Sequence, residues 1–168
     1  FLSGYNWRDG IGPRNQRPVR LDRAWHTIEP NLVGIDDFFD WTQKAGTAVM
    51  GAVNMGTGTP QDAADLVEYC NYPAGTAWSD LRIKNGHQKP HGIKYWCVGN
   101  EMDGPWQICH LDAVDYGKKA REAIKLMKWT DESIQTVICG SASSNMPTYP
   151  EWDRIVLEHT YDVADYLS

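Results

Sequence analysis

The sequence predicts an α/β protein and, within that class, a partial (β/α)8 TIM barrel. Amphipathic helices and short apolar strands alternate about four times, which is typical of βα units around a parallel sheet. No glycine-rich phosphate loop of the GxGxxG or GxxxxGK(S/T) type follows a strand, and this disfavours an open doubly wound sheet. A barrel needs about 250 residues, whereas this chain has 168. We therefore expect an incomplete barrel with pieces missing at both ends.

The first part of the chain predicts a long connection, then a helix and a strand. Residues 4–20 are rich in Gly, Arg and Pro and lack a sustained apolar pattern, so we expect a loop. Apolar residues recur at helical spacing from Ile35, and Gly46 supplies the stop, which predicts an amphipathic helix. The short apolar run 47–54 is typical of a buried strand.

The same unit then repeats. Thr59 and Pro60 provide an N-cap and a first-turn proline for a helix that extends to about Cys70. Turn residues across 71–90 predict a loop. The apolar run 93–99 predicts the next strand.

The last third of the chain predicts two more helices, and a strand follows each of them. The cleanest helical spacing of the chain lies in 113–127, and the run 136–139 after it predicts a strand. Residues 151–159 predict a short helix, and 163–167 predict the start of another strand.

Composition excludes several classes of function. The formal charge of −6 includes no Lys or Arg cluster, which argues against a nucleic-acid partner. No apolar run approaches the roughly 20 residues that cross a bilayer, so no membrane partner is expected. No signal peptide is visible, but the chain opens at Phe1 without a methionine, so this says little about the parent protein. Four scattered cysteines predict buried free thiols rather than a zinc site.

A carboxylate at the exit of the predicted strand 93–99 is the best catalytic candidate. The chain reads Asn100-Glu101 there, with Trp106 shortly after. Catalytic groups of barrels sit at the C-terminal ends of the strands. We expect Glu101 to be a general acid/base in aromatic surroundings that disfavour its charged form, and Asn100 to hold a substrate hydroxyl. A loop glutamate in solvent is the alternative. Eight tryptophans also permit a sugar-binding cleft, because flat rings stack on sugar faces.

The residues around Glu101 carry a family resemblance. Asn-Glu after a strand resembles the fourth strand of the clan of retaining (β/α)8 glycosidases, and the longer segment WCVGNEMDGPWQ (96–107) resembles the α-L-arabinofuranosidases of glycoside hydrolase family 51. The resemblance extends to SGYNW (3–7), GIGPR (10–14), RPVRLD (17–22), AWH (24–26), AVNMG (52–56), LVEYCN (66–71) and HTYD (159–162).

This resemblance implies a retaining exo-hydrolase that needs no cofactor and no metal. Its substrates are expected to be terminal non-reducing α-L-arabinofuranosyl groups of arabinoxylan, arabinan and arabino-oligosaccharides. A nucleophilic Glu attacks the anomeric carbon while Glu101 protonates the leaving oxygen, and Glu101 then deprotonates the incoming water. By the same resemblance Asn100 binds the 2-hydroxyl of the sugar and Trp25 forms an apolar wall of the pocket.

The resemblance also defines what lies outside this chain. Residues 1–168 are expected to be one incomplete catalytic domain, running roughly from the end of barrel strand 2 to the start of strand 6. The family's nucleophile belongs to strand 7, so none of these residues takes that role, and the family's C-terminal β-sandwich is absent. We expect this chain alone not to hydrolyse arabinofuranosides. Bacterial members imply a cytoplasmic, homo-oligomeric parent.

Other residues receive weaker assignments. Asn54 ends its predicted strand as Asn100 does and is a second candidate for substrate binding, as is Trp106; a turn role and loop packing are the respective alternatives. Asp103 is expected to order its loop, and Glu29 to be a solvated loop carboxylate. We assign no chemistry to His26, His110, His159, Ser141, Ser143 and Ser144.

Two rival functions stay open at this point. One is another retaining glycosidase of the clan, such as a β-xylosidase or an endoglucanase, which shares the Asn-Glu strand but differs in its pocket. The other is a non-catalytic carbohydrate-binding barrel. The long segment around Glu101 favours the arabinofuranosidase.

Overall fold

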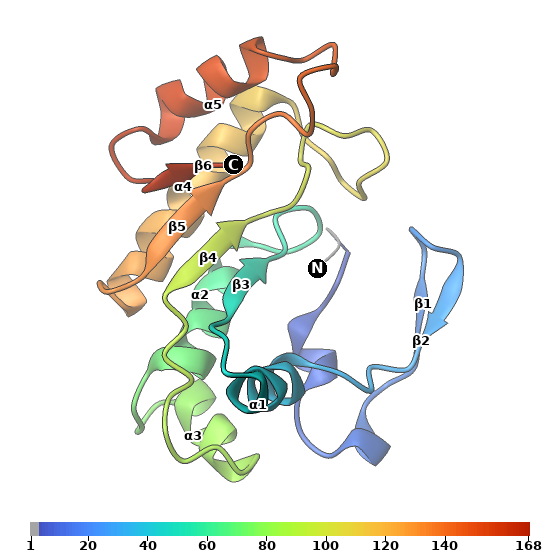
Figure 1. Ribbon diagram of the computed structural model, residues 1–168, viewed down its shortest axis with the longest axis vertical. Helices are drawn as coiled ribbons and strands as arrows, with labels where there is room; N and C mark the ends of the chain where they lie inside the picture. Colours follow the sequence, from blue (N-terminus) through green and yellow to red (C-terminus); the bar gives the residue numbers. More distant parts are fainter. Residues whose placement is uncertain (1–3) are drawn as a thin grey trace.

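The computed structural model describes residues 4–168, so Ser3 of the SGYNW segment lies outside the described residues. A four-stranded sheet with helices forms the body, and a small hairpin stands beside it (Figure 1). No helix within 4–168 is long and apolar enough to cross a membrane. The elements are η1 (Trp7–Gly10), η2 (Arg14–Gln16), β1 (Arg20–Asp22), β2 (Thr27–Glu29), α1 (Ile35–Ala45), β3 (Met50–Val53), α2 (Pro60–Asn71), α3 (Ala77–Lys84), β4 (Tyr95–Val98), α4 (Ala113–Thr130), β5 (Gln135–Ile138), α5 (Glu151–Thr160) and β6 (Tyr166–Leu167).

The sheet is parallel, and its order β3-β4-β5-β6 follows the chain. Ala52, Cys97 and Val137 are register partners, so their side chains share one face, here called the open face. Trp96 and Val98 point to the opposite face and are fully buried. Helix α4 contacts both α2 and α5, and α2 and α4 also contact the sheet. The carboxyl ends of all four strands therefore meet at one edge, where the loops that follow them gather.

The open face exposes apolar side chains. Met50, Tyr95 and Tyr166 keep 51%, 37% and 48% of their surface exposed. Met50 and Tyr95 are register partners, and the rings of Tyr95 and Tyr166 lie 6.3 Å apart. Contiguous exposed apolar surface of this kind is typical of interaction sites.

The elements of the sheet and most helices overlap their predicted ranges. Helix α1 ends at Gly46, whose φ of 68° suits a residue without a Cβ. Helix α2 begins after Thr59, whose hydroxyl accepts a hydrogen bond from the Asp62 N–H, while the Asp62 carboxylate accepts one from the Thr59 N–H. This reciprocal capping satisfies two N–H groups at the start of the helix.

The predicted loop 71–90 is wrong in part, because it contains α3. The inward side of this helix carries Arg82, which is fully buried. Its guanidinium donates to the carbonyls of Tyr69, Tyr72 and Pro73 at 2.9, 2.6 and 2.7 Å. An arginine in the position of an apolar residue breaks the helical pattern, so periodicity could not detect α3.

The start of the chain also differs from the expectation. The predicted loop 4–20 contains two 3₁₀ helices, and Glu29, expected in a loop, ends β2. Val19, Leu21 and Ile28 are 64%, 59% and 64% exposed. Since neither face of the hairpin is buried, its sequence lacks the alternation that identifies a half-buried strand.

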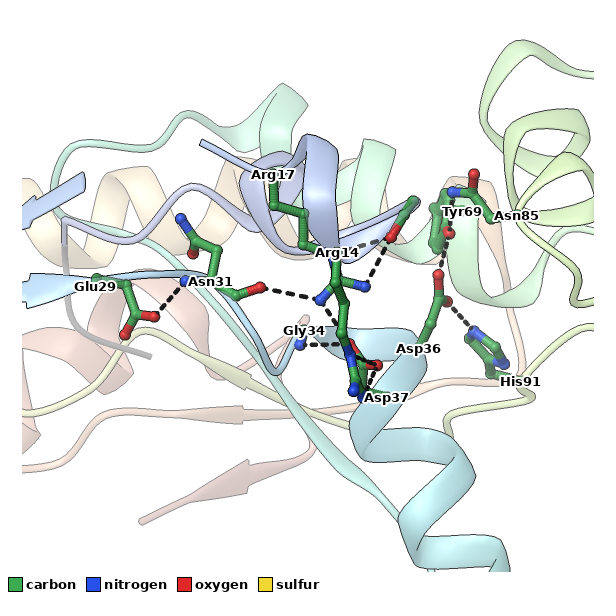
Figure 2. A network of polar contacts seen from close by, with 11 residues as sticks. Arg14, Arg17, Glu29, Asn31, Gly34, Asp36, Asp37, Tyr69, Asn85 and His91 are labelled. Carbon is green, nitrogen blue, oxygen red and sulfur yellow. Dashed lines mark hydrogen bonds and ion pairs between the residues drawn. The ribbon is translucent and has the colours of Figure 1, made fainter. Parts of the chain in front are cut away.

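A polar network ties the base of the hairpin to α1 (Figure 2). The Asp37 carboxylate accepts hydrogen bonds from the Gly34 N–H at 3.0 Å, from Arg14 at 2.7 Å and from Arg17 at 2.6 Å. Arg17 also donates to the Asn31 carbonyl at 3.0 Å. Burial by itself raises the pKa of Asp37, but the amide and the two guanidinium groups outweigh it and hold this pKa below its ordinary value.

A second, buried part of the network joins α1 to the elements around it (Figure 2). The Asp36 carboxylate accepts a hydrogen bond from the Tyr69 hydroxyl at 2.6 Å and lies 2.8 Å from Nε2 of His91. The Tyr69 oxygen in turn accepts a hydrogen bond from Asn85 at 3.0 Å. Burial, aided by the nearby carboxylate, raises the pKa of the Tyr69 phenol, so the phenol stays a donor at neutral pH. These bonds link α1, α2, the end of α3 and the segment before β4.

Candidate active site

Strand β4 ends in a strained turn that presents Glu101. Gly99 has a φ of 99° and Glu101 a φ of 46°. Gly99 tolerates this conformation because it has no Cβ, whereas positive φ at a non-glycine residue costs about 1–3 kcal/mol. The Gly104 N–H closes the turn on the Glu101 carbonyl at 2.9 Å. Backbone strain of this kind gathers at functional sites, where the surrounding structure maintains it.

Two donors hold the Glu101 carboxylate. Trp106 Nε1 donates to Oε2 at 2.8 Å, and Gln107 Nε2 donates to the same oxygen at 3.0 Å. The expected apolar surroundings are not found, because Glu101 is exposed and the indole meets the carboxylate through its N–H.

A cavity of about 390 Å³ opens beside Glu101, at the carboxyl ends of the strands. Asn100 and Glu101 line the side that follows β4, and Ser141 and Ala142 line the side that follows β5. The three register partners of the open face form part of the remaining lining. Its lining joins apolar side chains of the open face to polar groups of two loops, an arrangement typical of ligand sites.

Asp103 joins the two loops that flank the cavity. Its carboxylate is buried and accepts hydrogen bonds from Ser141 Oγ at 2.7 Å, Thr148 Oγ1 at 2.8 Å and the Ala142 N–H at 3.1 Å. These three donors all belong to the loop after β5. The loop-ordering role predicted for Asp103 is therefore confirmed, and its oxygens face this loop.

The two asparagines that follow strands have different surroundings. Asn100 is exposed and lines the cavity. Asn54 donates to the Tyr5 carbonyl at 2.9 Å and to Thr57 Oγ1 at 2.8 Å, and its Oδ1 accepts from the Gly56 N–H at 2.9 Å. Asn54 thus orders the loop after β3, and it is not among the described residues that line the cavity.

The two candidate tryptophans lie in different parts of the molecule. Trp106 contacts Glu101 and is 55% exposed. Trp25 lies in the turn between β1 and β2 and is 71% exposed. Figure 1 shows this hairpin standing apart from the sheet. Among residues 4–168, Trp25 is not part of the cavity lining.

The four cysteines are free thiols, but not all are buried as expected. Cys70 and Cys139 are buried, whereas Cys97 is half-buried and Cys109 is exposed. Burial raises the pKa of Cys139 to about 11 and also raises that of Cys97, so both cavity thiols stay protonated at neutral pH and are poor nucleophiles. The described part of the chain contains no group of three or more His, Cys, Asp or Glu residues placed to hold a metal ion.

Comparison with known proteins identifies the family. The family model "Alpha-L-arabinofuranosidase 1 domain" matches residues 1–168. The chain belongs to this α-L-arabinofuranosidase family. Intracellular exo-α-(1→5)-L-arabinofuranosidase 1 of Bacillus subtilis is 56% identical over 168 residues, which are 100% of this chain and 34% of that protein. An exo-α-(1→6)-L-arabinofuranosidase of Bifidobacterium longum is 47% identical over 100% of this chain and 32% of its own length. The chain thus spans about a third of the length of these curated relatives.

Solved structures of arabinofuranosidases share the fold. A family 51 α-L-arabinofuranosidase from Bifidobacterium longum matches with a TM-score of 0.97 and 48% identity, over 99% of this chain and 33% of that one. The enzyme from Thermotoga maritima, solved as an arabinose complex, matches with a TM-score of 0.93 and 41% identity, over 99% of this chain and 33% of that one. The resemblance to family 51 is therefore confirmed, together with an α/β fold built on a parallel sheet.

Sequence reasoning missed a residue that contacts Glu101 directly. Gln107 received no role, although it lies within the segment that carries the family resemblance. Its side chain reaches Glu101 only because the loop folds back on itself, and no pattern of residue types in the loop signals that return.

Proposed function

We propose that this chain is part of a retaining exo-α-L-arabinofuranosidase that releases terminal non-reducing α-L-arabinofuranosyl groups from arabinoxylan, arabinan and arabino-oligosaccharides. The observation that carries the proposal is the Glu101 carboxylate, presented by a strained turn at the end of β4 and lining the cavity at the carboxyl ends of the strands. The family match over residues 1–168 supports the substrate class.

The proposal includes a fold larger than the described sheet. Strands β3, β4, β5 and β6 are assigned as the third to sixth strands of a (β/α)8 barrel, and residues 1–168 as part of one catalytic domain. The exposed apolar residues Met50, Tyr95 and Tyr166 support this assignment, because side chains on the inner face of a closed barrel are packed together. The further strands and the family's β-sandwich are assigned to sequence beyond residues 1–168.

Glu101 is assigned as the acid/base of a double displacement. It first protonates the glycosidic oxygen while a second Glu, contributed from outside residues 1–168, bonds to the anomeric carbon. It then takes a proton from the water that releases arabinose. The two carboxyl groups of a retaining enzyme lie about 5–5.5 Å apart, which places the nucleophile across the cavity from Glu101.

The remaining site residues are assigned to substrate binding. Asn100, exposed in the lining of the cavity, is placed on the sugar 2-hydroxyl. Trp106 presents an exposed indole next to Glu101 and suits the leaving-group side. Trp25 is assigned as an apolar wall, which requires the hairpin to lie over the substrate. Asn54 acts through the loop after β3, which it orders.

The relatives and the family resemblance support proposals on the cellular location and oligomeric state of the parent enzyme. The Bacillus subtilis relative is named an intracellular enzyme, and we assign this protein to the cytoplasm on that basis. A homo-oligomeric parent is proposed from the family resemblance. The relatives are named arabinofuranosidases, which favours this activity over that of a β-xylosidase or an endoglucanase and over a non-catalytic barrel.

The test uses the protein encoded by the complete reading frame around this chain. Aryl α-L-arabinofuranosides should be hydrolysed with release of arabinose in the retained configuration, and aryl β-xylosides and cellobiosides much more slowly. Glu101→Ala should abolish turnover of an arabino-oligosaccharide. Added azide should restore turnover of a dinitrophenyl arabinofuranoside, because azide attacks the covalent intermediate without a general base. Inversion of configuration, or full activity of Glu101→Ala, would contradict the proposal.

A further inference from the structure

We propose that Gln107, together with Trp106, fixes the Glu101 carboxylate through Oε2 and so reserves Oε1 for the proton that passes to and from the substrate. Gln107 is in this view a positioning residue. The inference rests on the proposed function of Glu101 as the acid/base. It gives a role to Gln107, to which the sequence analysis assigned none.

The path of the loop brings the two donors to Glu101. After the Gly104 N–H closes on the Glu101 carbonyl, the Gln107 N–H closes on the Gly104 carbonyl at 3.0 Å, and the His110 N–H closes on the Gln107 carbonyl at 3.2 Å. These successive turns reverse the chain and return the side chains of Trp106 and Gln107 to the carboxylate. Gln107 is 6% exposed, so its amide is held by the protein rather than by solvent.

Both donors meet the same oxygen, and this arrangement has a chemical consequence. In the first step the proton on Oε1 moves to the glycosidic oxygen, which keeps the electron pair of its breaking bond to the anomeric carbon. Glu101 becomes a carboxylate at that moment, and the two N–H groups at Oε2 are already placed to stabilise the new charge. In the second step Oε1 takes a proton from water as the water oxygen bonds to the anomeric carbon and the bond to the nucleophile breaks.

The neighbouring carboxylate does not compete for these donors. Asp103 accepts its hydrogen bonds from Ser141, Ala142 and Thr148, all on the loop after β5. The loop therefore separates two tasks, because Asp103 holds the loops together while Trp106 and Gln107 orient Glu101. A carboxylate with two fixed donors on one oxygen cannot rotate away from the substrate without losing both.

The experiment compares leaving groups in the complete enzyme. Gln107→Leu and Trp106→Phe each remove one donor, and Gln61→Leu is the matched control, since its amide donates to Asp65 on the surface at 2.7 Å. Each site variant should lose about tenfold or more in kcat/KM on an arabino-oligosaccharide, whose leaving group needs a proton. On a dinitrophenyl arabinofuranoside, whose leaving group departs unprotonated, the loss should stay within about threefold. Gln61→Leu should match the wild type on both.

The pH profile separates positioning from a merely structural role. Removing a donor to the carboxylate favours its protonated form, so the basic limb of kcat/KM should move to higher pH in both site variants. Equal losses on both substrates with an unmoved pH profile would overturn the inference. If Gln107→Leu does not fold, Trp106→Phe decides, because its side chain is 55% exposed. A wild-type enzyme inactive on both substrates would instead refute the proposed function itself.

Discussion

The loop after β4 (residues 99–107) and the β1–β2 hairpin (residues 20–29) each carry a tryptophan of the candidate site, and they hold it in opposite ways. The loop is bonded along its length, from its strained turn at Glu101 to Trp106. The hairpin is bonded at its base through Arg17 and Asp37, while its apolar side chains and Trp25 face outward. Groups that move a proton need the first kind of support, whereas a wall that covers a substrate can use the second.

The largest expected difference between the two regions is catalytic. In the complete enzyme, Glu101→Gln should lower kcat on an arabino-oligosaccharide by about 10²–10⁴-fold, because the amide cannot donate the required proton. The matched change Glu29→Gln, on a carboxylate that accepts from the Asn31 N–H at the end of the hairpin, should leave kcat within about twofold. Steady-state kinetics of both variants check this. Comparable losses would show that the hairpin takes part in the chemistry.

The second expected difference between the loop and the hairpin is in how much a single variant lowers the free energy of unfolding. Asp103→Ala removes the buried acceptor of the Ser141 and Thr148 hydroxyls and of the Ala142 N–H, and we expect a loss of about 2–3 kcal/mol in the free energy of unfolding. Asp22→Ala removes only the acceptor for two N–H groups of the hairpin turn and should cost about 0.5–1 kcal/mol. Urea unfolding of the complete protein measures both. Equal costs would contradict the view that the loop is the more tightly held region.

The network around Asp37, where the hairpin joins α1, should make the stability of the protein depend on pH in the acid range. The pKa of Asp37 lies below its ordinary value of 3.8 in the folded protein, so its contribution to stability is complete above that pH and is lost as the pH falls through the folded pKa. The stability difference between the wild type and Asp37→Asn should therefore shrink between about pH 5 and about pH 3. Chemical unfolding at these two pH values tests it. If the stability difference between the two proteins is the same at both pH values, the charge of Asp37 does not contribute to stability through Arg14 and Arg17.

The smallest expected effect belongs to Trp25. Because its side chain is 71% exposed, Trp25→Ala should change the free energy of unfolding by at most about 0.5 kcal/mol. If the hairpin covers the substrate as proposed, the same variant should raise KM by about threefold or more and leave kcat nearly unchanged, since only uniform binding is lost. An unchanged KM would remove Trp25 from the site.

Local patterns were sufficient for the elements whose apolar faces meet the core. The helix stop at Gly46, the capping of α2 by Thr59 and the buried strand around Trp96 all follow from spacing and residue type. Patterns failed where a polar group replaces an apolar one, as Arg82 does in α3, or where nothing is buried, as at Ile28 in the hairpin. Both failures have one cause, since periodicity reports burial of apolar side chains only.

For the candidate site, the sequence by itself was enough to propose Glu101 and Asn100, because they stand together in one contiguous segment at the end of a strand. Only the tertiary structure decided what surrounds them. The register of parallel strands brings Ser141 and Ala142 to the other side of the cavity, and Asp103 bonds to both. Such contacts join residues about 40 positions apart, as the separation of 39 between Asp103 and Ala142 shows. These contacts arise from the path of the backbone in space, and local residue patterns carry no information about that path.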